Sequence, residues 1–150
     1  MTTMVYVACA EPREIVRFVM DRDSGALRRV DTTYVPGIDQ ASSTSMPLAV
    51  SPDKHVLHAA LRGVPYPGVS FAIAADGALS VLGGTNLPHQ ICYLTVDRTG
   101  RHIFAASYQG ALLASFKLDA RGAISGVATQ VVPTPPACHS VIQDANGRCV

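Results

Sequence analysis

The chain has 150 residues, of which 48% are hydrophobic and 15% are charged, and its formal net charge is +1. This composition supplies apolar material for a core, and the nearly neutral charge gives no electrostatic reason to expect nucleic acid or an anionic membrane as a partner. Aliphatic, β-branched and small residues are frequent and no stretch keeps a helical apolar period, so we expect an all-β protein.

The N-terminal residues and the cysteines bear on location and on metal binding. The first residues, MTTMVYVACAEPRE, contain no basic segment before the apolar run, and Glu11 interrupts that run. The sequence therefore predicts neither a signal peptide nor a membrane span. We expect a cytoplasmic location. The four cysteines show no CxxC spacing and no zinc-type pairing with histidine, so we expect buried, reduced thiols without a metal or a disulfide framework: Cys9, Cys92, Cys138 and Cys149.

The first predicted strands form an incomplete unit. Apolar runs at residues 5–10, 15–20 and 27–34 are separated by turns that contain proline, aspartate or glycine. Counted from the inside of a four-stranded unit, they correspond to the second, third and fourth strands. The first unit, residues 1–40, thus lacks an innermost strand.

Two complete units follow along the chain. Residues 41–88 contain predicted strands at 46–50, 55–61, 69–74 and 78–84, and residues 89–136 contain them at 90–96, 102–107, 112–118 and 123–131. Residues 137–150 supply only an inner strand and the start of the next one. The polar turns after the inner strands repeat regularly, since Ser51 and Asp97 are 46 residues apart and Asp97 and Asp144 are 47 apart. This period is typical of propeller blades.

We therefore predict a β-propeller of four-stranded blades, of which this chain contains about three. Closed propellers have about four to eight blades, so the sequence indicates a truncated arc. An open arc leaves apolar blade faces and unpaired strand edges, through which the chain is expected to self-associate.

Four stretches carry a family resemblance. TMVYVACAEPREI, MPLAVSPDKHVLHAALR, FAASYQGALLASFKL and ACHSVIQDANGR occur in this order, and together they resemble the N-terminal part of the bacterial seven-bladed propeller lactonases of the 6-phosphogluconolactonase type. The resemblance implies hydrolysis of 6-phosphoglucono-1,5-lactone in the pentose phosphate pathway, without a metal or an organic cofactor. Two alternatives stay open. One is a carboxymuconate-type lactonizing isomerase of the same fold, and the other is a non-catalytic propeller fragment that serves as an interaction module.

Three residues indicate a site on one face of the propeller, where the loops before the inner strands and the loops after the second strands open near the central channel. His139 precedes the last inner strand, and the resemblance places the family's suspected catalytic histidine there. An imidazole can activate water or protonate a leaving ring oxygen. Arg62, in LRGVPYPG, can bind a phosphate, and Tyr108, in SYQG, can bond a sugar hydroxyl. We predict His139 as catalytic and Arg62 and Tyr108 as substrate-binding.

Each of these residues also has a structural alternative, in which His139 packs at the start of its strand, Arg62 is solvated and Tyr108 fills the space between blades. The acidic and basic partners that the family proposes for the histidine lie in later blades, outside this chain. His89, just before an inner strand, is a minor candidate. Ser140 has no GxSxG motif around it, which argues against a serine hydrolase.

The remaining polar candidates are expected to be structural. Glu11 and Arg13 lie in the corresponding loop of the first blade and are predicted to be solvated rim charges. Three histidines lie on or beside second strands, with no carboxylates alongside to suggest a metal site: His55, His58 and His102.

Overall fold

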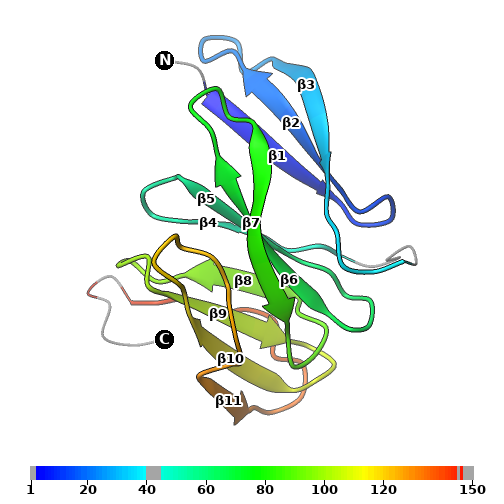
Figure 1. Ribbon diagram of the computed structural model, residues 1–150, viewed down its shortest axis with the longest axis vertical. Coiled ribbons are helices and arrows are strands. Elements are labelled where there is room, and N and C mark those ends of the chain that lie inside the picture. The colour runs from blue at the N-terminus through cyan, green and yellow to red at the C-terminus, as the bar shows by residue number, and fades with distance from the viewer. Residues whose placement is uncertain (1–2, 40–44, 145, 147–150) are drawn as a thin grey trace.

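The computed structural model describes residues 3–39, 45–144 and 146, within which lie eleven strands and no helix (Figure 1). The strands form three antiparallel sheets with the orders β1-β2-β3, β4-β5-β6-β7 and β8-β9-β10-β11. Each sheet is a meander of strands that follow one another in sequence. The structure thus confirms an all-β protein built from four-stranded units, the first of which has three strands.

The strand bounds agree closely with the predicted ranges in the first two sheets. The first sheet contains β1 (Thr3–Cys9), β2 (Glu14–Met20) and β3 (Leu27–Tyr34). The second contains β4 (Leu48–Val50), β5 (Val56–Ala60), β6 (Pro67–Ile73) and β7 (Leu79–Asn86). The boundary that we expect between residues 40 and 41 lies outside the described residues.

The third sheet contains β8 (Tyr93–Val96), β9 (His102–Ser107), β10 (Leu112–Lys117) and β11 (Gln130–Pro133). Its outer strand was predicted at 123–131, which is wrong, because β11 begins only at Gln130. Ala123 and Ile124 are instead buried, and the Ile124 N–H donates to Ser70 Oγ in the second sheet at 2.9 Å. Gly126 follows with φ +68°, a conformation that interrupts a strand.

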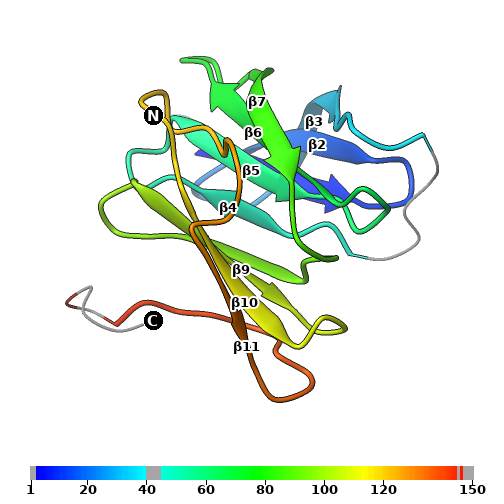
Figure 2. The same ribbon diagram turned by 60° about the horizontal axis from the view of Figure 1, so that its bottom comes forward.

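The predicted inner strand after residue 137 is also not observed. Residues 138–144 have no strand assignment, and after β11 the chain turns back and runs on without joining a sheet (Figure 2). The inner strands β4 and β8 each pair only with the next strand of their own sheet. The residues that would supply such a partner here follow residue 144, and most of them lie outside the described part of the chain.

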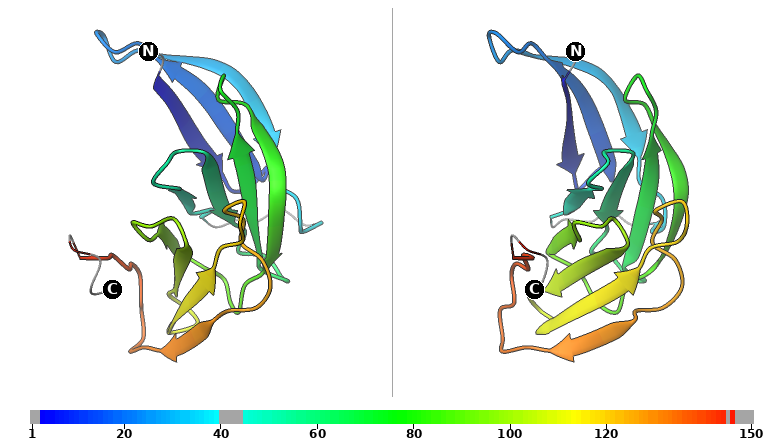
Figure 3. Two further views of the ribbon diagram at one scale, coloured as in Figure 1. Left: turned by 60° about the vertical axis from the view of Figure 1, so that its left-hand side comes forward. Right: turned by 90° about the vertical axis from the view of Figure 1, so that its left-hand side faces the viewer.

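The three sheets succeed one another as a curved arc (Figure 3). The inner strands β1, β4 and β8 lie along its concave side, and the outer strands β3, β7 and β11 lie along the opposite side. The inner strands β4 and β8 are in contact with one another. This is the radial arrangement of propeller blades, and we refer to the three sheets as blades 1, 2 and 3.

The repeated turns are held by side-chain capping. Ser51 Oγ accepts the Val56 N–H at 2.9 Å, and the carboxylate of Asp97, at the equivalent position, accepts the N–H groups of Arg101 and His102, both at 2.8 Å. These bonds and that of Thr99 lower the pKa of Asp97 against the opposing effect of burial. The sequence period therefore reflects one local hydrogen-bonding solution used in successive blades.

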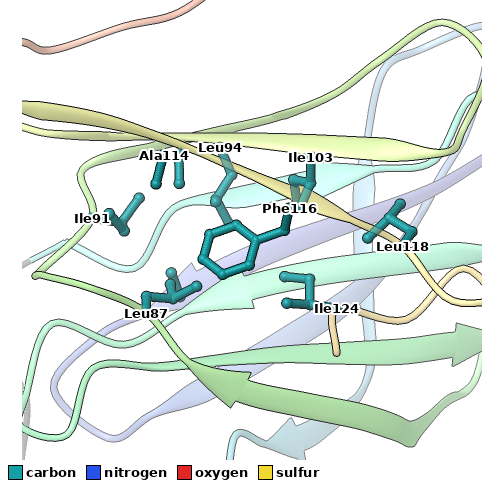
Figure 4. Close-up of a cluster of buried hydrophobic side chains, with 10 residues drawn as sticks. Leu87, Ile91, Leu94, Ile103, Ala114, Phe116, Leu118 and Ile124 are labelled. Carbon is teal, nitrogen blue, oxygen red and sulfur yellow. The ribbon is translucent and has the colours of Figure 1, made fainter. Parts of the chain in front are cut away.

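The cores lie between the blades. Between blades 2 and 3, Phe116 of β10 lies among aliphatic side chains that include Leu87, Leu94 and Ile124 (Figure 4). Between blades 1 and 2, a second cluster includes Ile15 and Phe71, both fully buried. Burying apolar surface between sheets is what holds one blade on the next.

Polar side chains add a link between blades 1 and 2. Arg17, which is 6% exposed, forms paired hydrogen bonds with Asp31 of its own blade at 2.9 and 2.6 Å and donates to the Asp76 carbonyl of blade 2 at 2.5 Å. Tyr6 Oη donates to the neighbouring Gly77 carbonyl at 2.7 Å. A buried arginine that is fully engaged in this way fixes the orientation of the two blades.

Candidate functional site

The turn between β9 and β10 brings the predicted site residues together. Its four residues, Ser107 to Gly110, contact side chains from three other segments. Ser107 bonds His89, Tyr108 packs against His139, and Gln109 accepts a hydrogen bond from Arg62. We call this segment the SYQG turn. The prediction that these loops open on one face is supported by these contacts, whereas the chemical roles of the residues stay predictions.

Arg62 is half-buried in the loop after β5, and neutral partners hold it. One terminal nitrogen donates to Ser45 Oγ at 3.0 Å and the other to Gln109 Oε1 at 2.6 Å. Its Nε is buried without a partner, and no carboxylate of the described residues forms an ion pair with it. The guanidinium is therefore fixed between two blades with its positive charge uncompensated, which favours an anionic ligand.

Tyr108 and His139 form an aromatic pair. Their rings meet edge to face, with centroids 5.7 Å apart and an interplanar angle of 83°. Tyr108 is 45% exposed, so it does not fill the space between blades. His139 is exposed as well, and its carbonyl lies 3.6 Å from Cys92 Sγ, a weak contact that ties this segment to the start of blade 3. Both polar tips can thus reach a ligand.

His89, a minor candidate from the sequence, also contacts the SYQG turn. Its Nδ1 lies 3.1 Å from Ser107 Oγ, and its ring stacks on Tyr66 with centroids 5.5 Å apart. Tyr66 comes from the loop after β5, the same loop that carries Arg62. Ser107, the partner of His89, could have been noticed in the repeat. Ser107 lies 46 positions after Leu61, so a polar residue here occupies the position that a buried apolar residue occupies in blade 2.

Several secondary expectations were tested by the structure. Arg13 is not solvated, because it donates to the Ile38 carbonyl and its guanidinium lies 5.0 Å from the Tyr34 ring centroid; Glu11 is exposed. Ser140 is exposed. The thiols of Cys9, Cys92 and Cys138 are free but only half-buried, and Cys149 lies outside the described residues.

The other histidines occupy different environments. His58 is fully buried in β5, whereas His55 and His102 are exposed. Within the described residues, no group of three or more His, Cys, Asp or Glu side chains is placed to hold a metal ion. The same part of the chain has no helix with the length and hydrophobicity that a transmembrane segment requires.

A cavity of about 840 Å³ lies away from the SYQG turn. It lies between blades 1 and 2 at the opposite ends of the strands, where Lys54, Asp76 and Tyr6 are among its lining residues. None of the predicted site residues lines it. The candidate site is the surface around the SYQG turn, at the other ends of the strands.

Comparison with known proteins agrees with the fold and with the motifs. Residues 4–150 match the family described as Lactonase, 7-bladed beta-propeller, and the chain belongs to this family. The 6-phosphogluconolactonase of Erwinia tasmaniensis is 32% identical over 148 residues, which cover 99% of this chain and 42% of the relative. That of Serratia proteamaculans is 36% identical over 110 residues, 73% of this chain and 31% of the relative. The chain thus spans less than half the length of these relatives.

Solved structures share the fold. A structure from Bacteroides fragilis, described as a candidate 6-phosphogluconolactonase, has a TM-score of 0.79 at 16% identity, over 91% of this chain and 37% of that one. The periplasmic gluconolactonase PpgL of Pseudomonas aeruginosa has a TM-score of 0.77 at 19% identity, over 91% of this chain and 38% of that one. The predicted family and propeller architecture are thereby confirmed.

Proposed function

We propose that the protein hydrolyses a phosphorylated sugar lactone, 6-phosphoglucono-1,5-lactone, and that the SYQG turn and its neighbours form part of the substrate site. The observation that carries the proposal is Arg62, a half-buried cation whose hydrogen-bond partners Ser45 and Gln109 are both neutral. Family membership and the names of the curated relatives support the same reaction. A cytoplasmic location belongs to this proposal.

Hydrolysis of the lactone requires one proton to be taken up and one to be returned. As water attacks the carbonyl carbon, a base removes its proton while the carbonyl electrons move to oxygen. When the carbonyl re-forms, the bond to the ring oxygen breaks and that oxygen receives the proton, which gives the hydroxy acid. We assign this transfer to His139, whose exposed ring is oriented by Tyr108. The scheme uses no metal or organic cofactor.

The other two residues bind the substrate in this proposal. The Arg62 guanidinium takes the phosphate, where its charge strengthens each hydrogen bond. The Tyr108 phenol bonds a sugar hydroxyl, since its ring is already engaged with His139 and 45% of the residue is exposed. Arg62 should therefore discriminate between phosphorylated and unphosphorylated lactones, whereas His139 should govern turnover.

The test is hydrolysis of freshly prepared 6-phosphoglucono-1,5-lactone and of glucono-1,5-lactone by the purified protein, each corrected for spontaneous hydrolysis. Arg62→Gln should raise KM for the phosphorylated lactone by about 10-fold or more, the equivalent of a charge-assisted hydrogen bond, and should leave KM for the unphosphorylated one nearly unchanged. His139→Gln should lower kcat by about 100-fold or more. Arg28→Gln, on the exposed strand β3, is the matched control for loss of one positive charge.

Soluble, folded protein that accelerates neither lactone would overturn the proposal and leave the interaction module as the alternative. Turnover of a muconate in the ring-closing direction, without lactone hydrolysis, would instead favour a lactonizing isomerase. Light scattering on the same samples measures the self-association predicted from the open blade faces.

A further inference from the structure

We infer that His89 is a fixed hydrogen-bond acceptor of the ligand site, held by Ser107 in the tautomer that carries its proton on Nδ1, so that Nε2 accepts a hydroxyl group of the ligand. The inference rests on the proposed function for the identity of the ligand, a hydroxylated anion. The tautomer itself depends only on hydrogen bonds within the protein.

The argument begins with the hydroxyl of Ser107, which is fully buried and has three polar neighbours. It donates to the Gln90 carbonyl at 2.7 Å and accepts the Gly110 N–H at 3.0 Å, while His89 Nδ1 lies at 3.1 Å. A carbonyl can only accept and a backbone N–H can only donate. The single hydroxyl proton is thus used by Gln90, and one lone pair is used by Gly110.

The remaining lone pair of Ser107 faces His89, so Nδ1 must be the donor. The opposite tautomer would place two lone pairs against one another at 3.1 Å, or would take the hydroxyl proton away from the Gln90 carbonyl. A neutral imidazole with its proton on Nδ1 has an accepting lone pair on Nε2. Ser107 is therefore a positioning residue that sets the hydrogen-bonding character of the opposite nitrogen.

The Nε2 atom of His89 is open to a ligand. It has no hydrogen-bond partner among the described residues, and it is not one of the buried unpartnered side-chain nitrogens, which belong to Arg13, His58 and Arg62. It is therefore in contact with solvent. A lone pair on a neutral nitrogen selects hydrogen-bond donors, of which the hydroxyl groups of a polyhydroxy acid or lactone are the chemically matching kind.

The ring is also held against rotation. One side stacks on Tyr66 at 5.5 Å between centroids with an interplanar angle of 18°. The backbone of Gly110 approaches so closely that an added Cβ would lie 2.8 Å from His89 Cγ. The SYQG turn thus fixes His89 through Ser107 and Gly110 and fixes Arg62 through Gln109. An anion that carries hydroxyl groups matches this pair of an acceptor and a cation.

The first test reads the tautomer directly. Long-range ¹H–¹⁵N spectra of the ligand-free protein, with His89 assigned by its absence in His89→Gln, should show a protonated Nδ1 and an unprotonated Nε2. Ser107→Ala should shift the equilibrium toward the other tautomer, whereas Ser80→Ala, a change of an exposed serine on β7, should leave it unchanged. His89 found with its proton on Nε2 in the unaltered protein would overturn the inference.

The second test reads the ligand contact. Addition of 6-phosphogluconate, the product of the proposed reaction, should shift the Nε2 resonance of His89 in the direction of an accepted hydrogen bond. Methyl phosphate at about pH 8, a dianion without a hydroxyl group, should not shift it. Equal shifts with both ligands, or no shift at a concentration that saturates binding, would contradict the role of Nε2. Because neither readout uses turnover, their failure is distinguishable from a failure of lactone hydrolysis.

Discussion

Two His–Ser pairs lie in different regions of this protein, and their comparison shows how a third partner determines what a histidine can do. His58 Nδ1 lies 3.0 Å from Ser70 Oγ inside the interface between blades 2 and 3. His89 Nδ1 lies 3.1 Å from Ser107 Oγ at the SYQG turn. In both pairs the serine accepts a backbone N–H, from Ile124 at 2.9 Å and from Gly110 at 3.0 Å respectively.

The pairs differ in where the serine proton goes. Ser107 gives its proton to the Gln90 carbonyl, which makes His89 the donor. For Ser70, the acceptor that the described residues offer is His58 Nδ1, which places the proton of His58 on Nε2. That Nε2 is buried without a partner, and burial lowers the pKa of His58 to about 4. One pair is therefore structural and neutral, and the other presents an accepting nitrogen to solvent.

The largest effect that separates the two pairs is expected from removing the serine hydroxyls. Ser70→Ala leaves the buried Ile124 N–H and His58 Nδ1 without partners and should lower the free energy of unfolding by about 4 kcal/mol. Ser107→Ala should cost only about 1 kcal/mol, because its partners lie near solvent. Urea denaturation measures both, with Ser80→Ala as the exposed control. Equal losses for Ser70→Ala and Ser107→Ala would contradict the distinction.

A somewhat smaller effect is expected from acid. The pKa of His58 is about 4 in the folded protein, below the value of 6.5 expected for the unfolded chain. Above pH 6.5 both states are neutral and the stability contribution is complete. As the pH falls from 6.5 to 4, His58 is protonated in the unfolded chain but stays neutral in the folded protein. The free energy of unfolding therefore decreases by about 3 kcal/mol.

Denaturation curves recorded across this pH range measure the loss. The slope of the unfolding free energy against pH should be reduced in His58→Gln. It should be retained in His55→Gln, which removes an exposed histidine. If the His58 variant does not fold, the NMR titration of His58 in the unaltered protein decides the question, and a titration at or above pH 6.5 would refute the expected loss.

The smallest effect concerns the glycine that holds His89. In Gly110→Ala the new Cβ would lie 2.7 Å from Ser107 Oγ and 2.8 Å from His89 Cγ, so both must shift, at about 2 kcal/mol. The same change should disturb the ¹⁵N pattern of His89. Gly83→Ala is the matched control, since its Cβ would meet only the Ala123 Cβ, at 3.4 Å. An undisturbed His89 in Gly110→Ala would show that the turn does not position the ring.

The sequence predicted the blades well where local chemistry repeats. Alternating apolar runs and capped turns such as those at Ser51 and Asp97 depend on near neighbours in the chain, so their spacing indicated four-stranded units. The outer strand of blade 3 was misplaced because Ala123 and Ile124 have the composition of a strand, yet they pack against blade 2. A contact between blades overrode a local preference there.

For the candidate site, the sequence indicated the loops but not their connections. Arg62, Tyr108 and His139 were predicted from their positions in the repeat and from the family resemblance. That Gln109 binds Arg62 depends on how blades 2 and 3 approach each other, and that Ser107 binds His89 depends on how β9 folds back beside the start of β8. The spacing of residues along the sequence does not give such distances between side chains. For this reason His89 was only a minor candidate.

By itself the sequence determined the all-β class, the blade period and the family, because each depends on residue types at regular intervals along the chain. Only the tertiary structure decided the character of the polar groups. A histidine on a strand and a histidine in a loop both contact a serine, but burial and the other hydrogen-bond partners of each serine set their protonation. Ile124 and Gln90 are distant in the chain from the serines that they contact, and folding brings them into place, whereas Gly110 lies only three residues from Ser107.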